Sequence, residues 1–186
     1  MPDNFGVYDG MKVWEFLDFF AVAYQIPRTR RKQVIGDVLE LLDLTHKRDD
    51  FVNGLSRGMK QRLCLAKTLV HDPPVLLLDE PTSGLDPAGR DTMLKLVREL
   101  GTEHGKSVIL STHLLADVQA VCERVVILAG GMVRGQGTVD ELCARRADRF
   151  RRRVQGDLAR FRDELLGAGV TVLADNGQGE LRVAVP

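Results

Sequence analysis

The chain has 186 residues, of which 44% are hydrophobic and 28% charged, and these values suit one globular domain with a small appendix. Basic and acidic residues both number 26, so the zero net charge predicts no nucleic-acid or membrane surface as a partner. Apolar runs such as residues 125–129 are too short to cross a bilayer, and no secretory signal opens the chain. The scattered cysteines Cys64, Cys122 and Cys143 lack zinc-ligand spacing and indicate reduced thiols that serve packing.

A helical region is expected after a loop over residues 1–10. Apolar residues recur at helical spacing in a first helix that Pro27 ends, in a second helix, and in a third over residues 57–70. The residues that carry this spacing are Val13, Leu17, Phe20, Ala21, Tyr24, Val34, Val38, Leu41, Leu42, Leu63, Ala66, Leu69 and Val70.

From residue 75 onward, strands are expected to alternate with helices. Residues 75–79 are an apolar run typical of a strand buried on both faces, and residues 108–113 are expected to form a second buried strand. Between them, Asp86-Pro87 opens a helix that reaches about His104. A short helix over 115–122, a hairpin around residues 130–131 and a capping box at 138–141 follow, then strand, helix, strand, strand from about 149. This alternation predicts an α/β fold with a largely parallel sheet.

Residues 101–107, GTEHGKS, look at first like a phosphate-binding loop. Such a loop needs G-x-x-x-x-G-K-[S/T] between a strand and a helix, so that helix N–H groups face the phosphates. Here only three residues separate Gly101 from Gly105, and the segment ends a helix and opens a strand. We interpret Gly105 as the residue that ends the helix with a positive φ. No other G-K-[S/T] occurs, so the sequence contains no phosphate loop.

The string VLLLDEPTSGLD, residues 75–86, is the strongest functional signal. A carboxylate at the end of a buried strand faces the crevice where α/β proteins bind ligands, so Asp79 is placed to hold Mg²⁺. Glu80 points differently and could take a proton from an attacking water. Two acids that merely end a strand are the alternative, and the whole string of twelve residues argues against it.

Two further signals point to phosphate. LSRGM, residues 55–59 and here called the signature turn, opens a helix in which Ser56 can cap and Gly58 lets a phosphate approach the free N–H groups. An ordinary helix start is the alternative. His113 follows the next strand and could contact a terminal phosphate, although a lone histidine is more often structural.

In this combination the chain resembles the nucleotide-binding subunit of ABC transporters over residues 1–145. LSRGM resembles the signature motif, VLLLDE the Walker B motif, SGLD at 83–86 the D-loop, and His113 the switch histidine. The resemblance implies an incomplete P-loop NTPase fold over residues 1–148, with a helical subdomain at about 11–70. Residues 149–186 resemble the C-terminal extension of ABC-2-type export subunits.

The chain departs from the family pattern at three places. Asp3 stands where the Q-loop has glutamine, and as a shorter oxygen donor it would serve the metal. Arg57 replaces a glycine of the signature motif and Met59 a glutamine, whereas Ser56 and Gly58 are kept.

The resemblance also implies a mechanism, in which two subunits enclose two ATP molecules together with Mg²⁺. Glu80 would activate water, His113 would hold the γ-phosphate, and Asp79 would hold the metal. The signature turn, through Leu55, Ser56, Arg57 and Gly58, would close the site of the other subunit, with Asp86 linking both sites. The pair would drive export through a membrane permease from the cytoplasmic face of the membrane, without nucleic acid.

Because the family's phosphate loop precedes the Q-loop, the sequence predicts a fragment or a gene model that starts at an internal methionine. Very weak ATP binding and negligible turnover are expected of the chain alone. A non-catalytic accessory half-subunit and a non-transport ABC ATPase are the alternatives. The arginine-rich run at 145–153 is interpreted as a solvated connection rather than a phospholipid or nucleic-acid contact.

Overall fold

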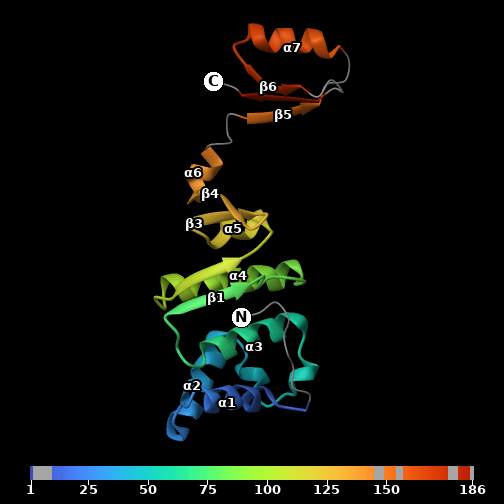
Figure 1. Cartoon of the computed structure of the whole chain (residues 1–186). Coiled ribbons are helices and arrows are strands. Elements are labelled where there is room, and N and C mark those ends of the chain that lie inside the picture. The colour runs from blue at the N-terminus through green and yellow to red at the C-terminus, as the bar shows by residue number, and fades with distance from the viewer. Residues whose placement is uncertain (2–9, 145–148, 154–156, 176–179, 185–186) are drawn as a thin grey trace. The chain divides into compact units, whose positions relative to one another are not determined.

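The structure is a computed structural model that describes residues 1, 10–144, 149–153, 157–175 and 180–184 (Figure 1). Its packing divides the chain into two compact units, Met1–Val121 and Cys122–Pro186. The domain boundary expected at residues 148–149 stays a prediction. None of the described helices combines the length and the apolar character needed to span a bilayer.

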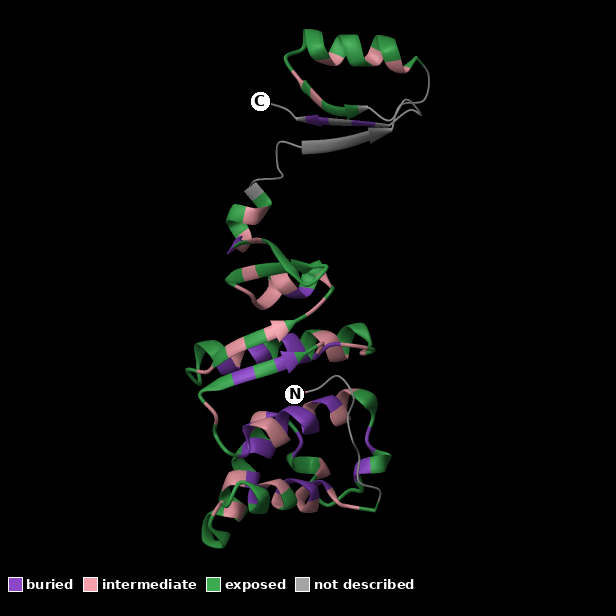
Figure 2. Ribbon diagram, in the orientation of Figure 1, coloured by how far each residue is buried: buried purple, intermediate pink, exposed green. Residues whose placement is uncertain are grey.

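Three helices form the first part of the chain, as the sequence predicts. They are α1 (Val13–Ala23), α2 (Arg28–Leu41) and α3 (Arg57–Leu69), with short 3-10 turns at Thr45–Lys47 and Val52–Gly54. Their apolar faces meet in one core (Figure 2), which includes Phe16, Leu17, Leu39, Leu63 and Leu65.

The end of α1 differs from its prediction. The helix stops at Ala23, and Pro27 is instead the N-cap of α2. Tyr24 is about half exposed rather than buried, and its ring stacks on His71 with the ring centroids 3.9 Å apart.

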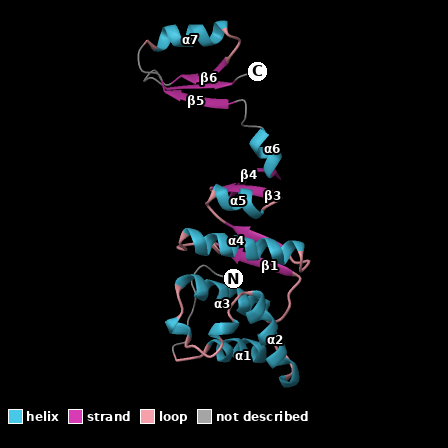
Figure 3. Ribbon diagram, turned by 180° about the vertical axis from the view of Figure 1, so that it is seen from behind, coloured by secondary structure: helices cyan, strands magenta, loops and turns pink. Residues whose placement is uncertain are grey.

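A parallel strand pair with a helix against it follows. Strand β1 (Val75–Asp79) pairs in parallel with β2 (Ser107–Ser111), and α4 (Pro87–Thr102) connects them before α5 (Leu115–Val121) begins. The view from behind shows α4 running along this pair (Figure 3). Leu76 and Leu78 of β1 belong to the same buried cluster as Met93, Val97 and Leu100 of α4.

The prediction that β1 is buried on both faces, with β2 as a second buried strand, is wrong for the described residues. Residues alternate along β1, with Leu76 fully buried and Leu77 62% exposed, and Ile109 of β2 is 63% exposed. One face packs on the core with α4, whereas the face of Leu77 and Ile109 is open. An apolar run therefore indicates a strand here, but it does not indicate how many faces of the strand are covered.

The segment GTEHGKS has the structural role that the sequence predicts. Helix α4 ends at Thr102, Gly105 has φ +62°, and the chain enters β2 at Ser107. Lys106 donates to Asp72 Oδ1 at 2.5 Å, so its ammonium group is engaged in an ion pair.

The second unit contains two antiparallel arrangements. Strands β3 (Arg124–Ala129) and β4 (Met132–Thr138) form the hairpin expected around Gly130 and Gly131, and the capping box is confirmed at the start of α6 (Val139–Ala144). Then follow β5 (Arg149–Arg153), α7 (Leu158–Gly167), β6 (Thr171–Asp175) and β7 (Glu180–Ala184), with the strand order β5-β7-β6.

This order of strand, helix, strand, strand confirms the prediction for the last part of the chain. The largely parallel sheet is confirmed only in the β1–β2 pair, because the other described strands form separate antiparallel sheets.

Candidate functional site

The first predicted site carboxylate lies at the shared edge of the parallel strand pair. The register sets Asp79, the last residue of β1, opposite Ser111, the last residue of β2. Because the carboxyl ends of parallel strands meet at one edge, side chains far apart in sequence come together here. The Ser111 hydroxyl donates to Asp79 Oδ1 at 2.5 Å. Ser111 is a site residue that the motif interpretation missed, although it opens the STH segment at 111–113.

Glu80 leaves the strand through an unusual backbone turn. Its φ is +45°, a conformation that side-chain-bearing residues rarely adopt. The turn is held by the Glu80 N–H, which donates to the Ser111 carbonyl at 3.2 Å. Glu80 Oε1 consequently lies 2.8 Å from Nδ1 of His113, a residue 33 positions further along the chain. Two residues that the sequence predicts separately thus form one pair.

The second oxygen of Glu80 is buried without a protein partner. Oε2 makes no hydrogen bond to any described residue, and the Glu80 side chain is only 25% exposed. A buried carboxylate oxygen without a donor is costly, and such groups mark places where a water or ligand binds. A carboxylate that has one oxygen free and the other against an imidazole can accept a proton from such a water.

The donor set fits a hard cation shared with a ligand. Asp79 and Ser111 supply a carboxylate and a hydroxyl oxygen, and Asp79 is exposed. The described residues contain no cluster of three or more His, Cys, Asp or Glu side chains able to hold a metal. Mg²⁺ commonly binds through one or two carboxylates together with phosphate oxygens, so Asp79 suits it. Asp3, the expected Q-loop donor, lies outside the described residues.

A buried polar network fixes the loop that follows Glu80. Thr82 Oγ1 donates to Asp117 Oδ2 at 2.5 Å, and Arg90 Nε donates to Asp117 Oδ1 at 2.6 Å. Asp117 is 1% exposed and lies on α5, just after His113. The network therefore joins the segments that carry Glu80 and His113. Sequence reasoning missed it, and the one signal was an acid within the mostly apolar helix over 115–121.

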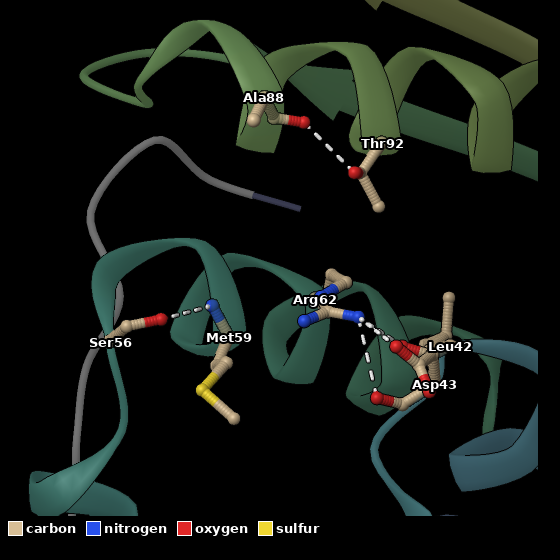
Figure 4. A network of polar contacts seen from close by, with 7 residues as sticks. All are labelled: Leu42, Asp43, Ser56, Met59, Arg62, Ala88 and Thr92. Atoms are coloured by element: carbon tan, nitrogen blue, oxygen red, sulfur yellow. Dashed lines mark hydrogen bonds and ion pairs between the residues drawn. The ribbon is translucent and has the colours of Figure 1, made fainter.

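The signature turn forms a capped helix start. Ser56 is the N-cap of α3, and its Oγ accepts from the Met59 N–H at 3.3 Å (Figure 4). Gly58 is open, because a Cβ built there would find its nearest neighbour, Leu85 Cδ2, 4.0 Å away. Leu55 is buried and packs in the core. The free N–H groups of this turn suit an anion.

A cavity of about 210 Å³ lies between the signature turn and the start of α4. Its lining includes Ser56, Gly58, Arg62, Asp86 and Thr92. Asp86 is the N-cap of α4 by position, as predicted, but its side chain makes no capping hydrogen bond.

Arg62 anchors one wall of this cavity. Its Nη1 donates to the Leu42 carbonyl at 3.1 Å and to the Asp43 carbonyl at 3.3 Å, so its position is fixed by the end of α2 (Figure 4). Sequence reasoning did not single out Arg62.

The predicted site residues thus fall into two groups within the first unit. Asp79, Glu80 and His113 lie together at the end of β1 and β2, whereas Ser56, Gly58 and Asp86 line the cavity. Arg57 also lines the cavity, but its guanidinium group donates to the Ser83 carbonyl at 3.1 Å. Residues 81–86 connect the two groups along the chain.

Comparison with known proteins gives one family. A family model described as ABC transporter matches residues 2–83. Four curated ABC transporter ATP-binding proteins are 35% to 40% identical, and the chain spans 40% to 48% of their length. A further relative is the linearmycin resistance ATP-binding protein LnrL of Bacillus subtilis, 33% identical over 145 residues, which cover 78% of this chain and 46% of LnrL.

Solved structures agree. CbiO1 of Clostridium perfringens, described as part of the ABC transporter complex CbiONQ, matches with a TM-score of 0.68 and 33% identity, over 74% of this chain and 55% of CbiO1. A dimeric structure of a bacterial ABC transporter cassette matches with a TM-score of 0.64 and 25% identity, over 74% of this chain and 60% of the cassette chain. The chain therefore belongs to the family of ABC transporter ATP-binding proteins and has part of the P-loop NTPase fold of their cassettes.

Proposed function

We propose that the chain acts as an ATP-binding and ATP-hydrolysing subunit of an ABC transporter, which powers export through a separate membrane permease. The observation that carries this proposal is the Glu80–His113 pair, with its oxygen and nitrogen 2.8 Å apart, beside the Asp79–Ser111 pair. A base, a phosphate-facing imidazole and a metal carboxylate at one strand edge are three of the parts that hydrolysis of a nucleoside triphosphate requires, the phosphate loop being another.

Each residue of this edge has a distinct task. The free Oε2 of Glu80 accepts a proton from the attacking water, while Oε1 stays against His113. His113, whose side chain is 71% exposed, donates to the γ-phosphate. Asp79 holds Mg²⁺, with Ser111 orienting its carboxylate. When bound, Mg²⁺ neutralises charge on the phosphates.

The signature turn serves a nucleotide held by a second ATP-binding subunit. Ser56 and Gly58 line a cavity whose lining includes neither Glu80 nor His113. An anion there meets the free N–H groups at the start of α3. Asp86, which lines the same cavity, would contact the other subunit. The dimeric arrangement of a related cassette supports this assignment.

Two relatives support the proposed partner and the proposed direction of transport. CbiO1 is part of a transporter complex and LnrL is named for linearmycin resistance, so a permease partner and export are the proposed setting. The subunit would work at the inner face of the cell membrane. A non-catalytic half-subunit that lends only its signature turn is the second candidate, since the signature turn and its cavity are formed without a G-x-x-x-x-G-K-[S/T] in the sequence.

The test joins the phosphate-loop segment of LnrL in front of residue 2. We expect this chimera to hydrolyse ATP with Mg²⁺, and Glu80→Gln to lower kcat by about a hundredfold or more because the base is lost. Lys95→Gln, on an exposed part of α4, is the matched control and should leave kcat unchanged. The 186-residue chain alone should show negligible turnover.

Two results would count against this function. An active chimera whose kcat is the same with Glu80→Gln would remove Glu80 from the chemistry. ATP hydrolysis by the chain alone that disappears with Glu80→Gln would refute its proposed inactivity.

A further inference from the structure

We infer that Arg57 is a positioning residue that fastens the loop after Glu80 to the signature turn. The effect of Arg57 on hydrolysis rests on the proposed function, whereas its contact with the loop does not. Arg57 is the first residue of α3, and its Nη2 donates to the Ser83 carbonyl at 3.1 Å, across 26 residues of sequence. The glycine that the family pattern has at this position could not form this hydrogen bond.

Gly84 is matched to Arg57. A Cβ built on Gly84 would lie 2.1 Å from Arg57 Cζ, so the guanidinium group rests directly against the glycine. Gly84 also has φ +64°, where other residues are strained. The loop thus favours glycine at residue 84 for its backbone, and a side chain there would displace the Arg57 guanidinium group.

The same loop is held from its other side by the buried network. Thr82 is bound to Asp117, and Ser83, the next residue, is bound to Arg57. Glu80 lies two residues before Thr82, and the Ser83 N–H donates to the Glu80 carbonyl at 3.0 Å. A displacement of the signature turn is therefore transmitted through Ser83 to the turn that aims Glu80. Arg57 thereby couples nucleotide at the signature turn to the base of the same chain.

The first test measures coupling between the two residues in the 186-residue chain without nucleotide. Arg57→Ala should lower the folding equilibrium constant about tenfold, as for a hydrogen bond to a charged group. Gly84→Ala displaces the same guanidinium group and so removes the same contact. In the double variant, the loss in the folding equilibrium constant should therefore be about tenfold smaller than the product of the two single losses. Lys60→Ala is the matched control, because Lys60 lies on the same helix and donates to the Asn53 carbonyl at 3.0 Å. When Lys60→Ala is combined with Gly84→Ala, the loss in the folding equilibrium constant should equal the product of the two single losses.

A second measurement does not depend on Gly84→Ala folding. Amide hydrogen exchange of residues 82–86 should accelerate about tenfold in Arg57→Ala and stay unchanged in Lys60→Ala. In the LnrL chimera, Arg57→Ala should lower kcat several-fold and leave the KM for ATP unchanged, since it moves the base and not the phosphate loop.

Independent single effects of Arg57→Ala and Gly84→Ala, or unchanged exchange of residues 82–86 in Arg57→Ala, would overturn the inference. Both results are obtained without ATP, so they leave the proposed function standing. An unchanged kcat in an active Arg57→Ala chimera would overturn the coupling to Glu80 alone.

Discussion

Glu80 combines a strained backbone with an unpaired buried oxygen. Its φ of +45° and the lack of a partner for Oε2 among the described residues both reduce stability. The surrounding contacts impose this conformation, because Ser111 holds the Glu80 N–H on one side and Asp117 holds Thr82 on the other. Strain kept at a residue whose side chain meets an imidazole is characteristic of a functional position.

His71 gives the chain a pH dependence away from that site. Partial desolvation lowers the pKa of His71, and the carboxylate of Asp72 partly opposes this effect. The unfolded chain therefore binds a proton at His71 before the folded chain does, so the free energy of unfolding should fall as the pH is lowered from 7 through 6.5. Urea unfolding at several pH values measures this slope.

His71→Phe is the informative variant, because it keeps a ring for Tyr24 to stack on and cannot titrate. Between pH 7 and the lowered pKa of His71, we expect the free energy of unfolding of this variant to fall less than that of the unmutated chain. A slope identical to that of the unmutated chain would show that His71 does not contribute.

Site residues differ in how far the sequence predicts them. Glu80 and His113 are recognisable because each follows an apolar run in a specific string, and the structure brings their side chains together. Ser111 and Asp117 are not recognisable from the sequence, because their roles depend on the strand register and on which face of α5 packs inward. The tasks of Glu80, His113 and Ser56 in hydrolysis stay predictions until they are measured.

At the scale of elements, β1 has one face in the core and one open face. Leu76 is fully buried whereas Leu77 is 62% exposed. Leu76→Ala should lower the free energy of unfolding by about 3 kcal/mol, because it leaves a cavity, and Leu77→Ala by less than about 1 kcal/mol. Urea unfolding of both variants checks the difference. Equal losses would mean that Leu77 is covered in solution.

Helices were predictable here because their periodicity extends over many residues. The apolar spacing identifies α1, α2 and α3, and the caps at Ser56 and Thr138 are confirmed as hydrogen bonds. The burial of β1 was not predictable, because the residues of a run such as 75–79 do not determine what packs on each face of the strand. Sheet order was also beyond the sequence, since hydrogen bonding between strands depends on distant segments.

At the scale of the whole molecule, one chain contains two separate parts of the proposed ATP site, and neither part is sufficient for hydrolysis alone. The Glu80–His113 pair and the cavity at the signature turn are separate, and Arg57 and the loop after Glu80 connect them. If each ATP takes its base from one subunit and its signature turn from the other, two differently defective subunits should repair each other.

The most direct measurement mixes two LnrL chimeras, one with Glu80→Gln and one with Gly58→Asp. The second variant places a carboxylate where phosphate is expected, and the open surroundings of Gly58 should allow it to fold. Each variant alone should be nearly inactive, and an equal mixture should regain about a quarter of the unmutated rate, because half of the dimers are mixed and hold one intact site. A mixture as inactive as its components would contradict the proposal that base and signature turn act across a dimer.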